Sequence, residues 1–308
     1  MAAAAADPPL WWGAYERLRW WLVDNPTVSS FEWSPGRTLG ASVPFVATAV
    51  ATYLAAVLVF RQGGGLLPLP SPPPAVLRLA SAAHNVVLLV LSAVMAAGCA
   101  LSALTRMPSP RWLFCFPPSP SPSANAAGPV FFWAHVFYLS KLYELADTLL
   151  ILLSGEGGRR RLTFLHVYHH AVVVVMCYVW LAASQSLVPI ALVTNAAVHV
   201  VMYGYYLSSS LGRRWPPRWK RAVTEIQIAQ FVFSFAVSLV FLCYHFRSAA
   251  GCRGMSGWLF NAVFNVSLLA LFLNFHTRAY PASASPNDNE NENENEKKKK
   301  KKKKKNRA

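Results

Sequence analysis

The sequence predicts an all-α integral membrane protein with seven transmembrane helices, and three observations support this. Of the 308 residues, 54% are hydrophobic and only 14% are charged, whereas soluble domains carry about 25% charged residues. The apolar residues fall into runs near the length of about 20 residues that crosses a bilayer as a helix. Lysine and arginine gather in alternate connections between these runs, as the positive-inside rule predicts for cytosolic loops.

Hydropathy places the seven spans along the chain. They are residues 39–60, 76–104, 131–153, 162–183, 187–208, 222–246 and 258–276. The third span departs most from the apolar pattern, because it contains Lys141, Glu144 and Asp147.

The basic residues also orient the chain. An odd number of spans places the two termini on opposite sides, and the lysine run 297–305 adds to an excess on the C-terminal side. We therefore predict a cytosolic C-terminus and a luminal N-terminal segment, 1–38, before a membrane domain, 39–280. The Asn-, Glu- and Lys-rich tail, 281–308, is predicted to be disordered because it lacks the apolar residues of a core.

The net charge of +16 does not indicate a nucleic-acid-binding protein. The basic residues lie mainly in the predicted cytosolic connections and tail, where anionic membrane lipid is the expected partner. The five cysteines show no metal or redox spacing. Cys115 and Cys252 both fall in connections assigned to the luminal side, and we hypothesise a disulfide between them.

Four consecutive spans carry polar side chains in helical patterns. A charged group at the bilayer centre costs about 2.5–3.5 kcal/mol on insertion scales, so residues kept there usually have a function. In the third and fourth spans, the spacing puts these side chains on one face of the helix. In chain order the four sets are Lys141, Glu144, Asp147 and Thr148; His166, His169 and His170; Asn195, His199, Met202, Tyr203, Tyr205 and Tyr206; and Thr224, Glu225, Gln227 and Gln230.

Some of these residues also have structural interpretations. Lys141 and Glu144 have the spacing of an intrahelical salt bridge, which would leave Asp147 without a partner. Tyr205 and Tyr206 are placed where aromatic residues anchor a span at the interface. The amides of the sixth span could instead bind neighbouring helices. Three histidines within five positions of one membrane helix have no comparable structural explanation.

The direction of each span places the four sets at one depth. The third and fifth spans run toward the cytosol, and their polar residues lie in the middle and second half of each span. The fourth and sixth spans run away from the cytosol, and their polar residues lie in the first half. The sets are therefore predicted to meet in the cytosolic leaflet. Basic residues in the adjoining connections form a rim suited to a phosphorylated ligand. They are Arg159, Arg160, Arg161, Arg213, Arg214, Arg218, Lys220 and Arg221.

Histidine in such a pocket serves as metal ligand, general base or nucleophile. A membrane di-iron desaturase or hydroxylase would use about eight histidines, the number present, but His84, His135, His245 and His276 stand alone in the sequence. Metal-free acyl transfer fits the arrangement better, with one histidine attacking a thioester while another group stabilises the oxyanion. A seven-span transporter or receptor is a further alternative, disfavoured by the concentration of histidines on one helix.

The four polar sets resemble, in order, the four signature motifs of the ELO-type very-long-chain fatty acid elongases. Phe164 and Leu165, just before the histidine box, match as well. The motifs cover about residues 131–230, and the seven spans extend the likeness to most of the chain. The N-terminal 38 residues and the tail lie outside it.

The resemblance implies a seven-helix enzyme of the endoplasmic reticulum membrane whose site opens to the cytosol. Members of the family resemble 3-ketoacyl-CoA synthases that use no metal or bound cofactor and take long-chain acyl-CoA and malonyl-CoA as substrates. By that similarity His169 is the candidate nucleophile, and His199 assists proton transfer or stabilises the oxyanion. The resemblance leaves His166 and His170 to position these groups. The remaining residues of the four sets would shape the site.

The same resemblance names the expected partners in the elongation cycle. They are a ketoacyl-CoA reductase, a 3-hydroxyacyl-CoA dehydratase and an enoyl-CoA reductase. Very-long-chain products of such a cycle enter lipid biosynthesis, including that of sphingolipids.

Overall fold

The computed structural model describes residues 10–62, 72–118, 126–155, 162–213 and 215–280. Within these ranges the chain is helical and forms no strand, and its one isolated β-bridge joins Glu32 to Ala127. The predicted all-α class is therefore confirmed.

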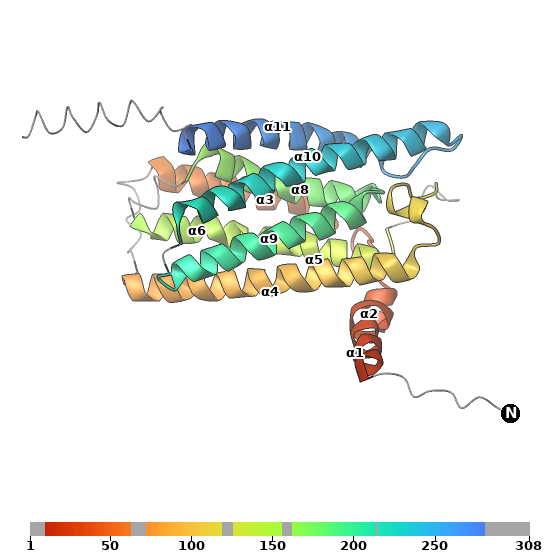
Figure 1. The fold of residues 1–308 in the computed structure, drawn as a ribbon. Coiled ribbons are helices and arrows are strands. Elements are labelled where there is room, and N and C mark those ends of the chain that lie inside the picture. The colour runs from red at the N-terminus through yellow and green to blue at the C-terminus, as the bar shows by residue number, and fades with distance from the viewer. Residues whose placement is uncertain (1–9, 63–71, 119–125, 156–161, 214, 281–308) are drawn as a thin grey trace, which may run out of the picture.

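Six helices in the described ranges are long and apolar enough to cross a membrane. They are α3 (Val43–Gln62), α4 (Pro74–Arg106), α8 (Phe164–Ala182), α9 (Val188–Ser210), α10 (Pro217–Arg247) and α11 (Met255–Ala279). These helices run along a common axis as a bundle (Figure 1). Large apolar side chains such as Leu239, Phe246 and Val263 are exposed on its outer faces, as expected for surfaces that contact lipid. The chain is thus a multi-pass membrane protein.

The predicted third span, 131–153, consists of two helices instead of one. Helix α5 (Pro129–Tyr143) ends at Glu144, and α6 (Leu145–Leu153) begins directly after it. The two follow one another along the bundle (Figure 1). With 15 and 9 residues, neither is long enough to cross a bilayer alone, so the predicted total of seven spans is not confirmed. The break coincides with a charged residue whose side chain is completely buried.

The N-terminal segment begins with α1 (Leu10–Arg19), the π-helix η1 (Trp20–Asp24) and the short α2 (Pro26–Ser29). These elements run across the direction of the bundle beside the C-terminal end of α4 (Figure 1). Asp24 ties them to the bundle, because its carboxylate binds both Arg19 at 2.9 Å and Arg106 of α4 at 2.8 Å.

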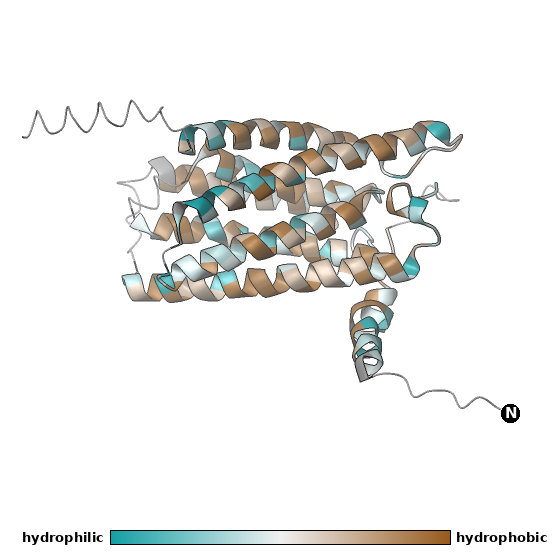
Figure 2. Cartoon of the chain, viewed as in Figure 1, coloured by the Kyte–Doolittle hydropathy of each residue, from teal (hydrophilic) through white to brown (hydrophobic). Residues whose placement is uncertain are grey.

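The centre of the bundle is an apolar core made by α4, α5, α8 and α9. At Gly98, α4 approaches α5 so closely that a Cβ atom would lie 2.2 Å from Cε2 of Trp133. The ring of Trp133 therefore occupies the space that any larger residue would need. Figure 2 shows that the hydrophilic residues of α10 gather mainly in its N-terminal part, near the start of α8 and the end of α9.

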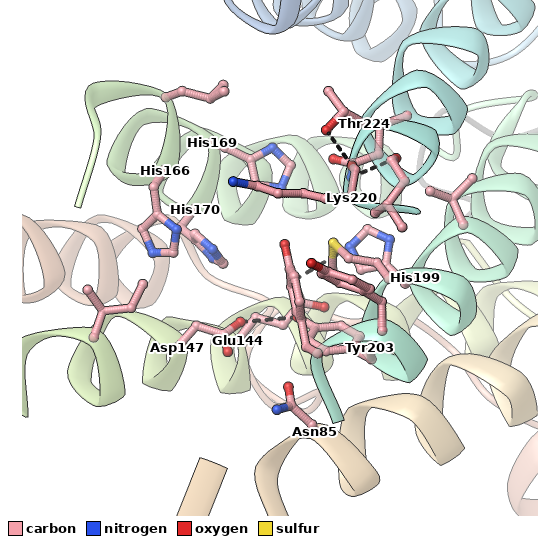
Figure 3. A pocket seen from close by; sticks show the side chains of 18 of the residues that line it. Asn85, Glu144, Asp147, His166, His169, His170, His199, Tyr203, Lys220 and Thr224 are labelled. Atoms are coloured by element: carbon pink, nitrogen blue, oxygen red, sulfur yellow. Dashed lines mark hydrogen bonds and ion pairs between the residues drawn. The ribbon is translucent and has the colours of Figure 1, made fainter. Parts of the chain in front are cut away.

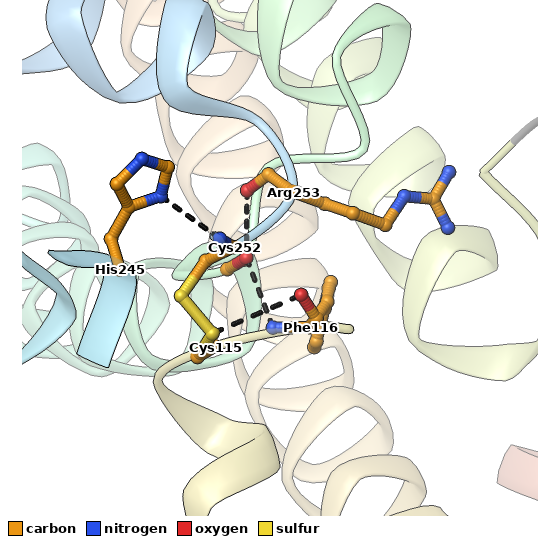
Figure 4. Close-up of a disulfide and its surroundings, with 6 residues drawn as sticks. Cys115, Phe116, His245, Cys252 and Arg253 are labelled. Carbon is orange, nitrogen blue, oxygen red and sulfur yellow. Dashed lines mark hydrogen bonds between the residues drawn. A yellow bond between two sulfur atoms is a disulfide. The ribbon is translucent and has the colours of Figure 1, made fainter. Parts of the chain in front are cut away.

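A disulfide closes the opposite end of the bundle (Figure 4). Cys115 follows the 3₁₀ helix η2 (Pro110–Leu113), and Cys252 lies between α10 and α11, with Cα atoms 5.1 Å apart. These are the two cysteines paired in the sequence analysis. Neighbouring hydrogen bonds hold the same junction, since Ser186 Oγ accepts from the amide of Phe116 at 3.1 Å and donates to the carbonyl of Arg253 at 2.7 Å.

Gly98→Ala is expected to lower the stability of the protein by about 1–3 kcal/mol, because the added methyl group overpacks the contact with Trp133. Gly204→Ala in α9 is the matched control, since a Cβ there meets nothing within 4 Å. Thermal unfolding in detergent measures both variants. Equal melting temperatures for the two would contradict the packing described here.

Replacing both Cys115 and Cys252 by serine is expected to lower the melting temperature, because a disulfide that closes a long loop contributes about 2–4 kcal/mol. The two residues are 137 positions apart in the sequence. Non-reducing peptide mapping of the wild-type protein should recover the linked pair. Recovery of both thiols in free form would refute this connection.

Candidate active site

A pocket of about 640 Å³ opens among α4, α6, α8, α9, α10 and α11. Figure 3 shows side chains of α4, α6, α8, α9 and α10 converging on it. Residues from all four predicted polar sets line the pocket: Glu144, Asp147, His166, His169, His170, Asn195, His199, Met202, Tyr203, Tyr205, Tyr206, Thr224, Gln227 and Gln230. The groups expected at one depth therefore share one chamber.

Three residues of the predicted sets are absent from the pocket lining. Lys141 and Thr148 are buried behind it and bind residues that line it. Glu225 lies on the exposed surface of α10, where Arg221 binds it at 2.7 Å and His276 at 3.3 Å.

A buried cation is held at the break between α5 and α6. The Lys141 ammonium donates to Glu144 Oε1 at 2.7 Å and also contacts His199 Nε2 at 3.2 Å. Both partners of this ion pair are 1% exposed. Because a buried charge without a partner costs several kcal/mol, the pair explains how an ammonium group can remain inside a membrane bundle.

His199 has both ring nitrogens engaged within the protein. Its Nδ1 lies 2.9 Å from the carbonyl oxygen of Asn195. A carbonyl only accepts, so Nδ1 carries the ring proton and Nε2 is left to accept from Lys141. In this arrangement His199 is a neutral imidazole with no free nitrogen.

The three histidines of α8 lie in its first two turns, just after Thr163, whose side chain caps the helix by accepting from the amide of His166. His166 Nε2 is 2.9 Å from Thr148 Oγ1. That hydroxyl is in turn 3.0 Å from the hydroxyl of Tyr53 on α3. His166 is therefore tied to α6 and, through Thr148, to α3.

His169 and His170 are held differently from His166. Neither imidazole forms a hydrogen bond with any described residue, and Nδ1 of each is buried. His170 is buried and packs against His166, with ring centroids 4.3 Å apart. His169 is only partly buried and lines the pocket next to Phe264, at a centroid distance of 6.4 Å. His169 is thus the more accessible of the two unbonded imidazoles.

Only some of the predicted rim residues lie in the connections between helices. Arg159, Arg160, Arg161 and Arg214 lie outside the described residues, and Arg213 follows α9. Arg218, Lys220 and Arg221 were expected in a connection, but they lie in the first turns of α10, because that helix begins at Pro217. A proline at the first helical position is well suited to start a helix this early. Of the described rim residues, Lys220 alone lines the pocket (Figure 3).

The pocket also has an apolar part suited to a hydrocarbon chain. Its apolar lining residues come from α6, α8, α9, α10 and α11. They include Leu150, Ile151, Leu165, Val198, Phe231, Phe272 and Phe275.

The sequence analysis did not predict that α4 contributes polar residues to the pocket and its wall. His84 stands alone in the sequence, but its Nε2 lies 2.9 Å from Oδ1 of Asp147. Its neighbour Asn85 lines the pocket and donates to Ser210 Oγ at 3.0 Å. Two adjacent polar residues inside an apolar span were the available signal. Ser81, one turn earlier, also lines the pocket, but one hydroxyl in an apolar span is a weak polar signal, and the sequence analysis did not include it.

The described residues contain no group of three or more histidine, cysteine, aspartate or glutamate side chains arranged to hold a metal ion. The geometry of the histidine box therefore gives no support to the di-iron alternative.

Comparison with known proteins identifies the family. The model of the GNS1/SUR4 family, called ELO, matches residues 38–290. The chain belongs to the ELO family. The match begins at the end of the N-terminal segment and includes every helix that lines the pocket.

Curated relatives of this ELO protein carry consistent names. A putative fatty acid elongase of Dictyostelium discoideum is 32% identical over 69% of this chain and 70% of the relative. The fatty acid elongase 3-like protein of Arabidopsis thaliana is 27% identical over 85% of this chain and 92% of its own. The long chain fatty acid elongase 1 of Caenorhabditis elegans is 38% identical over 48% of this chain and 51% of its own.

Lys141→Met is expected to destabilise the protein by about 3–5 kcal/mol, because it leaves the Glu144 carboxylate buried without its cation. Arg221→Met is the matched control. It removes an ion pair between exposed side chains of one helix, and little or no loss of stability is expected. Thermal unfolding in detergent distinguishes the two, and an equally small effect at Lys141 would contradict the buried pair.

Proposed function

We propose that this ELO protein is a fatty acid elongase that acts as a very-long-chain 3-oxoacyl-CoA synthase, joining malonyl-CoA to a long-chain acyl-CoA. The observation that carries this proposal is the state of His169. Its imidazole reaches a pocket with an apolar part, and no described residue binds either of its nitrogens. A free, neutral imidazole beside space for an acyl chain is suited to attack a thioester.

In the first half-reaction, the lone pair of a His169 ring nitrogen attacks the carbonyl carbon of acyl-CoA. The carbon–sulfur bond breaks, coenzyme A leaves as the thiolate, and the acyl group remains on the imidazole. The apolar residues Leu165, Phe231 and Phe272 would hold the hydrocarbon chain during this step. Lys220, with the other basic residues of the rim, would bind the phosphates of coenzyme A.

In the second half-reaction, malonyl-CoA loses carbon dioxide, and the electron pair of the broken bond attacks the acyl carbon. The bond between the acyl carbon and His169 then breaks, which restores the neutral imidazole and releases 3-ketoacyl-CoA. His199 would assist proton transfer only after its bond with Lys141 breaks, because both of its nitrogens are engaged. In the arrangement seen here, its role is to support the position of the Lys141 cation.

The proposal includes a location and a topology. We propose that α5 and α6 together form the third of seven spans. The termini would then lie on opposite sides of the endoplasmic reticulum membrane, and the excess of basic residues on the C-terminal side favours a luminal N-terminus and a cytosolic C-terminus. The mouth of the pocket, where Lys220 lies, would then face cytosolic acyl-CoA and malonyl-CoA. No bound metal or cofactor takes part. The reductases and dehydratase of the elongation cycle would receive the product, and sphingolipids are one destination of the acyl chain.

His169→Ala is expected to abolish formation of 3-ketoacyl-CoA from a long-chain acyl-CoA and malonyl-CoA, with a loss of at least about 1,000-fold, because the nucleophile is missing. The purified protein is assayed by mass spectrometry of the products across a series of acyl chain lengths. Wild-type enzyme mixed with acyl-CoA alone should also release one equivalent of coenzyme A in a burst.

The matched control is His135→Ala, since His135 lies on α5 outside the pocket and bonds the backbone of Leu39. It should retain both the burst and the turnover. Turnover by the His169 variant at the wild-type rate would refute the nucleophile. A wild-type protein without condensing activity would refute the proposed function itself.

A further inference from the structure

The Asp147 carboxylate is held by two donors from different helices. His84 of α4 binds Oδ1 at 2.9 Å, and the Tyr203 hydroxyl of α9 donates to Oδ2 at 3.1 Å. Asp147 itself belongs to α6, so the three residues connect three helices at the wall of the pocket. The carboxylate accepts from both sides, and each of its oxygens has a protein partner.

Asp147 differs in this respect from Glu144, the other acidic residue in the pocket lining. The Lys141 cation binds Glu144 directly. Among the described residues, the partners of Asp147 are an imidazole and a phenol. The position of its charge therefore depends on Tyr203 and on His84, which is 6% exposed and packs against Tyr143 with the rings tilted and their centroids 4.8 Å apart.

The direction of these hydrogen bonds determines what Tyr203 offers to the pocket. A phenol has one proton, and Tyr203 gives it to Asp147. Toward the chamber, the Tyr203 oxygen can therefore act only as an acceptor, for an N–H or S–H group. If His84 were absent, the Asp147 carboxylate could rotate and release the Tyr203 proton to other acceptors.

We propose that His84 is a positioning residue of the active site. It holds the Asp147 carboxylate, and through it the orientation of the Tyr203 hydroxyl, in the geometry that the condensation requires. This inference rests on the proposed function, because its effect is read in the reaction that His169 begins. His84 touches no reacting atom and acts through Asp147.

The test compares two variants of His84, one that keeps the aromatic ring and one that keeps the hydrogen-bond donor. His84→Phe keeps an aromatic ring against Tyr143 and removes the hydrogen-bond donor, whereas His84→Gln keeps an N–H donor. Losing one charge-assisted hydrogen bond should lower kcat about 10- to 100-fold in the Phe variant. The KM for acyl-CoA should change less than about threefold, because the apolar lining and the rim are unaltered. The Gln variant should keep at least about a third of the wild-type kcat.

A double-mutant cycle tests whether the effect of His84 on kcat depends on Tyr203. If it acts by orienting Tyr203, then His84→Phe added to Tyr203→Phe should lower kcat no more than about threefold below Tyr203→Phe alone. A double variant whose loss is the product of the two single losses would overturn the proposal. So would a Phe variant with a wild-type kcat, or a Gln variant as impaired as the Phe variant.

Rate constants are referred to the amount of folded protein, measured by gel filtration in detergent. If His84→Phe does not fold, His84→Asn replaces it, since its shorter amide does not reach Asp147, and the same outcomes apply. His135→Gln is the control for loss of a histidine elsewhere in the bundle. An inactive wild-type protein would refute the proposed function, whereas an active wild type with unaffected His84 variants would refute this inference alone.

Discussion

The buried ion pair of Lys141 and Glu144 is the interaction on which the site depends. The pair lies at the junction between α5 and α6, and the Lys141 ammonium also binds His199 of α9. A membrane interior tolerates such a charge only with a close partner, and this pair lies at the break in the third predicted span, in contact with α9. The cost of burying these groups indicates that the site, and not the fold alone, requires them.

Much of the fold could be predicted because hydropathy reports directly on helices that cross a bilayer. All six long helices coincide with predicted spans, with ends that differ by a few residues. The third span was different. Its apolar residues continue on both sides of Glu144, so hydropathy shows one segment and does not reveal the change of helix at that residue. The early start of α10 at Pro217 was also missed, because its first turns are too basic to register as membrane-spanning.

The site was predictable where polar residues repeat at helical spacing. Because alternate spans run in opposite directions, the positions of the polar residues along four spans predicted one common depth, and the pocket contains members of all four sets. His84 belonged to none of these sets, and only the fold shows that it meets Asp147, 63 positions away. The hydrogen bonds of each histidine could not be predicted from the sequence either, since they are made with partners such as the Asn195 carbonyl and Thr148.

We propose that His169 accepts the acyl group, because among the described residues it is the one pocket histidine whose imidazole is both without a hydrogen bond and partly exposed. An experimental structure of the enzyme, determined after reaction with a long-chain acyl-CoA and without malonyl-CoA, tests this most directly. The account predicts density for the acyl carbon bonded to a ring nitrogen of His169, with the chain lying along Phe231 and Phe272. Density for the acyl group on another side chain, or a chain lying outside the chamber, would contradict it.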